Sequence, residues 1–489
     1  MRKALLSASA AALVLTSSAV TAQNPVRTLD PRLVAEAQRQ HPELVQEYGG
    51  AVTDHRGAYV DSVGHRVAQF SGVADPRSAY RFTLLNSAVE NAFAVPGGYI
   101  YLTRQLMTLM NDESELAFAL GHEVGHVAAG HAQSRQRVAQ RNSIGGILGA
   151  ILGSVVGGGF GSVIAQMTQQ GAALRTLSYS REQEFEGDVF GLRYMMAAGY
   201  DPAGAAGILA TLTRNTALEA RTHGRDNRQL PEWASTHPMS ENRMQRAAAE
   251  ARRTGRLGTG ITNRDLFLDQ LDGAYVDDDP EQGVIDGRSF THPDLKIQFT
   301  VPVGYLMQNS SRAVSISGSA GKAQFGGGRT NGTLENYVYT ALQELAGNRR
   351  LAVPPPRRTT VNGIPAAYTI TRTRTGSGMV DVGIIAYQWA PGTIYHFVML
   401  TSPGSGFGPF GPMVGSIRKI SPTEAATIRP RVIDVVTVRP GDTIGSLAGQ
   451  MAYRDFQLER FLVLNALAPN AQLVPGQKVK LVVYGSREA

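Results

Sequence analysis

The chain has 489 residues, with 47 basic and 40 acidic side chains and no cysteine. This length predicts about two to four domains, and a hydrophobic content of 43% is enough to build their cores. The net charge of +7 is mild, and the sequence has no lysine- or arginine-rich run. Both features argue against nucleic-acid binding. The lack of cysteine excludes disulfides, a thiolate metal site and a lipidated N-terminal cysteine.

Residues 1–22 have the pattern of a secretory signal peptide. Arg2 and Lys3 form a charged start, a short apolar run continues to Val20, and small residues precede a cleavage point after Ala22. The alternative is a membrane anchor, but the run is short and rich in alanine and serine. The pattern therefore predicts a protein that is exported to the periplasm.

Helices and two strands are predicted before the central motif. Residues 28–75 carry apolar side chains at roughly helical spacing, with a break at Gly49 and Gly50. Tyr80–Leu85 and Gly98–Leu102 are predicted strands, and a Pro-Gly-Gly sequence makes the turn before the second.

An H-E-x-x-H motif, His122-Glu123-Val124-Gly125-His126, lies within a stretch of good helix formers. Four positions separate the histidines, so their rings project from one helical face and can take two corners of a tetrahedral zinc site. Glu123 lies beside them, where a general base can reach a water on the metal. The alternative is a helix whose histidines only make ordinary hydrogen bonds.

A third metal ligand must come from elsewhere in the chain. His131 follows His122 by nine positions, about 180° around a continuous helix, and is predicted to point away from the metal. In a later acidic stretch, Glu184 and Asp188 are four residues apart and share one helical face. Glu184 can complete the ligands, and Asp188 can fix the tautomer of a ligating histidine. Taken alone, this stretch has the composition of a solvated helix face.

Residues 144–164 contain eight glycines and no charged side chain. The segment is long enough to span a bilayer, but so many glycines disfavour a stable single helix. It is therefore predicted to be an apolar loop or hairpin that covers the cleft in which a substrate would bind. The segment is also the candidate contact with a membrane surface or an envelope protein.

Together these stretches resemble the M48 family of zinc metallopeptidases, which have H-E-x-x-H and a later E-x-x-x-D. Asn91–Ile100 resembles the family's strand before the zinc helix, and Ser235–Pro238, followed by Arg243, resembles its late His-Pro segment. Gly187 departs from the family pattern, which usually has alanine there. The resemblance covers roughly residues 30–255.

The resemblance implies one zinc ion per chain, held by His122, His126 and Glu184, with one position left for water. It also implies that His237 stabilises the oxyanion of the tetrahedral intermediate. The alternative for His237 is a structural cap on the helix that starts at Met239.

Supporting roles follow from the same resemblance. Asp188 and Arg243 are predicted to orient the site or the substrate. One strand would border the cleft and pair its open edge with an extended substrate, against the alternative of an ordinary core strand; its residues are Gly98, Tyr99, Ile100 and Tyr101.

The second half of the chain has a different character. Residues 264–275 are predicted to form a closing helix, and the acidic residues 277–281 a solvated linker. Residues 285–420 contain several alternating stretches and one helix near 333–346, which predicts a mostly antiparallel α+β domain. We expect it to present substrate or to bind a partner.

Residues 432–485 are predicted to follow the order β-α-α-β. The sequences Val438-Arg439-Pro440-Gly441-Asp442 and Leu473-Val474-Pro475-Gly476-Gln477 resemble a LysM domain. The resemblance implies that this part binds N-acetylglucosamine-containing glycan, here peptidoglycan. The segment Met451–Asp455 departs from the usual polar loop, and the alternative is a small fold kept only for packing.

The sequence thus predicts a multidomain protein with a signal peptide (1–22), a mainly α-helical α+β zincin peptidase domain (23–275), an antiparallel α+β domain (285–420) and a LysM-like domain (432–485). The predicted function is an exported zinc endopeptidase that cleaves unfolded or misassembled envelope proteins, located in the periplasm near the outer membrane or cell wall. The alternatives are an envelope chaperone with a latent peptidase site and a peptidoglycan-associated hydrolase.

Overall fold

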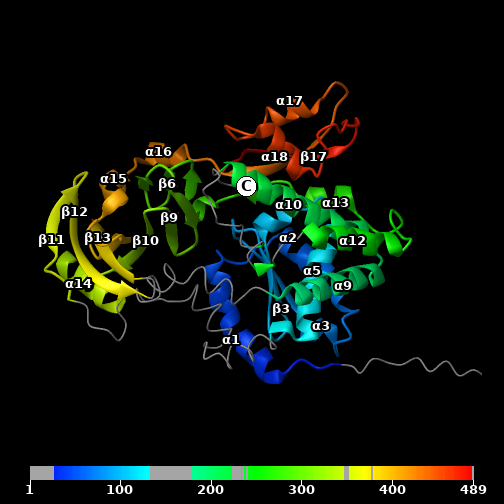
Figure 1. Cartoon of the computed structure of the whole chain (residues 1–489). Coiled ribbons are helices and arrows are strands. Elements are labelled where there is room, and N and C mark those ends of the chain that lie inside the picture. Colours follow the sequence, from blue (N-terminus) through cyan, green and yellow to red (C-terminus); the bar gives the residue numbers. More distant parts are fainter. Residues whose placement is uncertain are drawn as a thin grey trace, which may run out of the picture.

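The computed structural model describes three parts of the chain (Figure 1): a helical part, a β-rich part and a C-terminal unit. The predicted signal peptide and the glycine-rich segment 144–164 lie outside the described residues. Within the described part, no helix has both the length and the apolar composition needed to cross a bilayer. The structure describes residues 27–132, 179–222, 233, 236–237, 241–345, 352–375 and 378–486.

The helical part is built around α5 (Glu113–Ala129), which carries the H-E-x-x-H motif. Asp112 caps the start of α5 by accepting a hydrogen bond from the Glu115 backbone N–H, and Gly130 ends it at φ +68°. The helix is buried on nearly all sides because α2, α9, α10 and β2 pack around it. The helices of this part are α1 (Pro31–Glu47), α2 (His55–Ala68), α3 (Pro76–Ala79), α4 (Arg104–Leu109), α5, α9 (Arg181–Ala197), α10 (Ala203–Thr222), α12 (Glu241–Arg253) and α13 (Arg264–Leu271).

A three-stranded sheet lies beside α5, in the order β1 (Arg81–Leu85), β3 (Tyr99–Thr103), β2 (Ala92–Val95). The prediction that Gly98–Tyr101 forms an open edge is wrong, because β3 is the central strand, paired with β1 on one side and β2 on the other. The tight turn at Gly97 and Gly98, both with positive φ, folds the chain back so that β2 covers the outer side of β3. The edge strands of this sheet are therefore β1 and β2, and β2 is the one whose Ala92 carbonyl contacts His237.

The pairing of β2 also decides which backbone groups point outward. The Thr103 N–H donates to the Asn91 carbonyl over 2.9 Å, so Asn91 and Thr103 form a hydrogen-bonded pair. Pairs alternate along an antiparallel ladder, so the backbone groups of Ala92 and Ala94 point away from β3. These are the groups that an added strand would meet.

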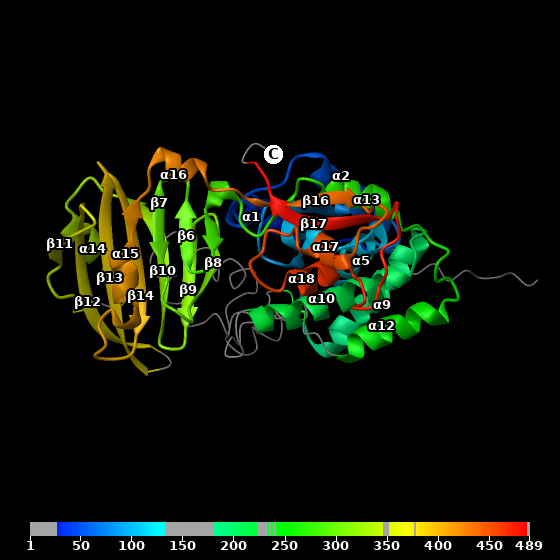
Figure 2. The same cartoon turned by 90° about the horizontal axis from the view of Figure 1, so that it is seen from above.

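The C-terminal unit has the observed order β16 (Arg431–Thr437), α17 (Ile444–Ala448), α18 (Gln457–Leu464) and β17 (Lys478–Tyr484). A strand of the helical part, β4 (Tyr275–Val276), extends its sheet by pairing with β16. Buried residues of the unit belong to the same hydrophobic core as α5. Seen from above in Figure 2, the unit rests on the helical part, where its elements contact α10 and α13.

Lys480 of β17 strengthens this docking. Its side chain is fully buried, and its ammonium group donates to the carbonyls of Thr108, over 2.8 Å, and Met110 in the segment that leads into α5. Burial lowers the pKa of Lys480, while the nearby Glu115 carboxylate opposes that shift. The C-terminal unit is thus packed onto the helical part rather than held by a linker alone.

The β-rich part consists of two antiparallel sheets, which confirms the predicted antiparallel character of this region. One helix, α14 (Leu334–Leu345), packs on β12 and β13, close to its predicted position. Aromatic side chains fill the core between the sheets, among them Phe299, Phe325 and Phe397. The larger sheet has the order β11 (Arg357–Val361), β12 (Ile364–Thr375), β13 (Gly378–Ala390), β14 (Thr393–Thr401), β10 (Gly321–Arg329), β9 (Ala313–Gly318), β8 (Leu306–Asn309). The smaller has the order β15 (Arg418–Lys419), β7 (Ile297–Thr300), β6 (Ser289–His292), β5 (Val284–Asp286), and short helices lie at η1 (Pro280–Gln282), η2 (Gly408–Phe410), α15 (Gly411–Ser416) and α16 (Pro422–Ala426).

The acidic segment 277–281 is not the solvated linker that its composition predicts. Asp278 and Asp279 are buried, and burial raises the pKa of Asp278 to about 7. The compensating charge is the buried guanidinium of Arg104, which donates to the backbone carbonyls of Tyr275 and Asp277. Local composition could not indicate this burial, because the arginine that balances the acidic side chains lies outside the segment.

Candidate metal centre

The metal centre depends on a close crossing of α5 and α9, which small residues on both helices allow. A Cβ atom added to Gly121 of α5 would lie 3.2 Å from the Cα of Gly191 on α9. A Cβ added to Gly187 would lie 2.8 Å from Cε1 of His122 and 3.1 Å from Nε2 of His126. The departure from the family pattern at Gly187 therefore leaves room at the histidine rings, beyond its effect on helix propensity.

Four buried side chains converge at this crossing: His122 and His126 from α5, Glu184 from α9, and His237. Each offers one ligand atom, and these atoms all lie within 4.8 Å of one another. The Nε2 atoms of His122 and His126 face each other at 2.9 Å. The Glu184 carboxylate lies 3.7 Å from the first of these atoms and 3.6 Å from the second. Imidazole nitrogens and a carboxylate without thiolates form a donor set that fits a divalent metal ion of the zinc type.

Asp188 and Arg243, whose predicted role is to orient the site, contact His122 and Glu184 of the cluster. Asp188 Oδ1 lies 3.1 Å from Nδ1 of His122, which leaves the Nε2 of that ring facing the cluster. The Arg243 guanidinium binds the Asp188 carboxylate at two points, 2.9 and 2.6 Å, and lies 2.6 Å from Glu184 Oε2. Burial alone would raise the pKa of Asp188, but Arg243 outweighs it and lowers that pKa to about 2. Burial likewise would raise the pKa of Glu184, but His237 and Arg243 outweigh it and lower that pKa, so both carboxylates are held ionised.

His237 lies between the carboxylates of Glu184 and Glu123. Its Nδ1 is 3.0 Å from Glu184 Oε1, and its Nε2 is 3.5 Å from Glu123 Oε1 and 3.2 Å from the Ala92 carbonyl on β2. Trp233 stacks on the imidazole with ring centroids 4.4 Å apart. Burial would lower the pKa of His237, but the two carboxylates outweigh this effect and raise it. The surroundings of His237 thus favour the protonated form of its imidazole.

His131 is not among the four described residues that converge, so the prediction that it is not a metal ligand is confirmed, although its ring does not lie on the far side of the helix. The predicted direction of its side chain required a continuous helix, but α5 ends at Ala129, and Gly130 turns the chain in the left-handed region. His131 therefore returns to the site, where its Nδ1 lies 2.7 Å from Nδ1 of His126 and its Nε2 lies 3.1 Å from the Glu186 carboxylate. These contacts leave Nε2 of His126 facing the cluster. The glycine before His131 was the sequence signal for this break.

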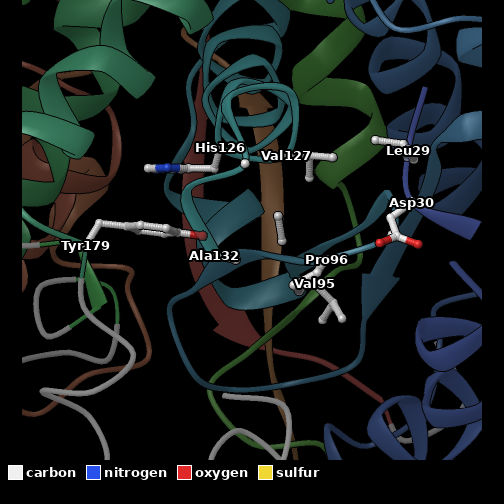
Figure 3. Close-up of a pocket in the computed structure, with 11 residues that line it drawn as sticks. Leu29, Asp30, Val95, Pro96, His126, Val127, Ala132 and Tyr179 are labelled. Atoms are coloured by element: carbon white, nitrogen blue, oxygen red, sulfur yellow. The ribbon is translucent and has the colours of Figure 1, made fainter. Parts of the chain in front are cut away.

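Tyr179 is a site residue that the sequence did not predict. Its ring stacks on that of His126, with centroids 3.6 Å apart and planes 8° from parallel. Its backbone N–H donates to the Thr236 carbonyl over 3.3 Å, next to His237. No sequence pattern marks this tyrosine. Figure 3 shows it beside His126 at the mouth of a pocket.

Comparison with known proteins agrees with this geometry. Residues 54–251 match the model of Peptidase family M48. The predicted family resemblance is confirmed for this M48-matching region, which contains every member of the cluster and ends before the β-rich part. The chain is also similar to proteases from bacteria and from a eukaryote.

A Beta-barrel assembly-enhancing protease of Yersinia pestis is 30% identical to this chain over 210 residues, covering 40% of this chain and 38% of that protein. Its namesake in Escherichia coli (strain K12) is 28% identical over 202 residues, covering 38% and 37%. The Mitochondrial metalloendopeptidase OMA1 of Schizosaccharomyces pombe is 28% identical over 213 residues, covering 43% and 58%. The chain thus spans less than two fifths of the length of the two bacterial relatives.

Proposed function

We propose that this chain is an exported zinc-dependent endopeptidase of the periplasm that cleaves unfolded or misassembled envelope proteins. The observation that carries the proposal is the convergence of His122, His126 and Glu184 beside the buried carboxylate of Glu123. The names of the bacterial relatives, beta-barrel assembly-enhancing proteases, support a protein substrate in the cell envelope.

The residues divide the chemistry among them. A zinc ion held by His122, His126 and Glu184 would lower the pKa of a bound water toward neutrality and polarise the scissile carbonyl. Glu123 takes a proton from the attacking water and later delivers it to the leaving amine. His237 donates a hydrogen bond to the oxyanion that develops on the carbonyl.

Substrate recognition is proposed to use the edge of β2 in place of the strand that the sequence indicated. The outward backbone groups of Ala92 and Ala94 can pair with an extended peptide. The 3.2 Å contact between Nε2 of His237 and the Ala92 carbonyl supports this choice of edge. Pairing through the backbone suits unfolded substrates of varied sequence.

Removal and return of the metal test the proposal. We expect purified residues 23–489 to cleave unfolded casein, to lose that activity on treatment with a chelator, and to regain it with about one equivalent of zinc. Cleavage is followed by loss of intact casein on a gel. Full activity in the chelated and dialysed protein would contradict the proposal.

A second candidate is an envelope chaperone that binds unfolded proteins through a latent, inactive peptidase site. The position of His237 favours this candidate. A zinc site with four protein ligands is closed, whereas a catalytic site keeps one position open. His237 belongs to the set of four atoms that lie within 4.8 Å of one another, so it can supply the fourth ligand. Activity that rises in His237→Ala would support latency, whereas a fall would support the oxyanion role.

A glycan-binding role for residues 432–485 remains part of the proposal, since the β-α-α-β order is compatible with the LysM resemblance. We propose peptidoglycan as its partner. A peptidoglycan hydrolase is the weaker candidate for the metal centre, because an exposed strand edge suits a peptide backbone better than a sugar. Incubation of the protein with labelled casein and with purified peptidoglycan separates these functions.

A further inference from the structure

A pocket opens beside the metal centre, between the end of α5 and the β2–β3 turn (Figure 3). Its walls are mainly apolar, and among the described residues that line it the only acidic group is the carboxylate of Asp30. Two residues connect the pocket with the metal centre and with the edge of β2. His126 is both a member of the metal cluster and a pocket wall, and Ala94 is both a pocket wall and an outward-facing position of β2.

The outer wall of the pocket comes from the first described residues of the chain. Arg27 anchors this segment, since its guanidinium donates to the Ala128 carbonyl at the end of α5 over 2.7 Å. The backbone of Arg27 also bonds to that of Gly72 and Ala74. Leu29 and Asp30 follow immediately and line the pocket. The segment is thus held against the helix that carries the metal ligands.

The positions of the two wall residues are well defined. A Cβ atom on Gly98 would lie 2.8 Å from Cδ1 of Leu29, so glycine at this turn makes room for the leucine. Asp30 caps α1, because its Oδ1 accepts a hydrogen bond from the Arg32 backbone N–H over 2.9 Å. The side chain of Asp30 is otherwise exposed at the rim of the pocket.

We propose that Leu29 and Asp30 form the outer wall of a specificity subsite for one substrate side chain next to the scissile bond. A peptide paired with β2 passes Ala94 and His126, so one of its side chains enters the pocket. The apolar walls favour an aliphatic side chain, and the Asp30 carboxylate disfavours an acidic one. This inference rests on the proposed peptidase function.

A peptide series tests the subsite. Each peptide is cleaved at one bond, and the residues on either side of that bond are varied in turn among Gly, Leu and Asp. At one of these positions we expect kcat/KM to be highest for Leu, lower for Gly and lowest for Asp. Leu29→Trp should lower kcat/KM for the leucine peptide by about 10- to 100-fold and spare the glycine peptide, because the larger ring fills the pocket. Asp30→Asn, which keeps a capping group, should raise cleavage of the aspartate peptide by about 2- to 5-fold.

The matched control is Val303→Trp, which adds the same ring at a valine that is 80% exposed in the β-rich part. It should leave the preference unchanged. An unchanged preference in Leu29→Trp, with bound zinc equal to that of the parent chain, would overturn the subsite and leave the peptidase function standing.

A binding measurement separates failure of the subsite from failure of the function. The Glu123→Gln chain is titrated into the same peptides carrying a fluorophore, and anisotropy gives each Kd. Leucine-selective binding that Leu29→Trp abolishes would support the subsite even if the parent chain cleaves nothing. Equal Kd values for the three peptides would overturn it.

Discussion

Replacing Glu123 by glutamine is expected to lower the rate of casein cleavage by about 10²- to 10⁴-fold while bound zinc stays unchanged. The amide has the shape of the carboxylate but cannot accept a proton from the attacking water. Glu123 is fully buried and is not one of the convergent metal-binding residues, so its replacement removes the base and leaves the metal donors in place.

The control for this substitution is Glu182→Gln, the same chemical change at an exposed position in the first turn of α9. Its rate should match that of the parent chain. Initial rates are measured with zinc-loaded proteins, and bound zinc is measured in each sample. A Glu123→Gln chain that retains more than about a tenth of the parent rate would exclude Glu123 as the general base.

Replacing Arg243 by methionine is expected to lower the free energy of unfolding by about 3–5 kcal/mol. Arg243 is 1% exposed and pairs with two buried carboxylates, those of Glu184 and Asp188. Methionine fills much of the volume but leaves both negative charges uncompensated. A bound zinc ion supplies positive charge at Glu184, so the loss should be larger in chelator than in zinc.

Urea unfolding of the parent chain and the Arg243→Met variant, each with zinc and with chelator, measures this effect. Arg252→Met on the exposed side of α12 is the matched control and should change the free energy of unfolding by less than about 0.5 kcal/mol. An Arg243→Met effect as small as that of the control would show that the two carboxylates do not depend on the arginine.

The sequence predicted which side chains share a face at the candidate metal centre, because that geometry is local within each helix. The spacing of His122 and His126, and that of Glu184 and Asp188, decides which side chains share a helical face. The approach of α5 to α9 followed only from the family resemblance and not from residue spacing, because it depends on glycine contacts between helices. Helical periodicity correctly left His131 out of the metal ligands but did not predict its contact with His126, since a rule for a continuous helix fails once Gly130 ends that helix.

The remaining differences concern contacts between distant segments. Alternation identified β3 as a strand but not its place in the sheet, because strand order depends on the fold around the Gly97–Gly98 turn. Composition could not show that Lys480 docks the C-terminal unit on the segment before α5. Likewise, nothing local to Leu29 marks it as a wall of the pocket beside His126. All three features depend on how distant segments fold together.

Bound zinc in the parent chain and in Glu184→Gln tests the central claim most directly. Both proteins are dialysed against the same buffered free zinc, and the metal is measured by mass spectrometry, with Glu182→Gln as the control. We expect about one zinc ion per chain in the parent and the control, and a large loss in Glu184→Gln, because an amide is a much poorer ligand than a carboxylate. Absence of zinc in the parent chain, or undiminished zinc in Glu184→Gln, would contradict the assignment of this metal centre.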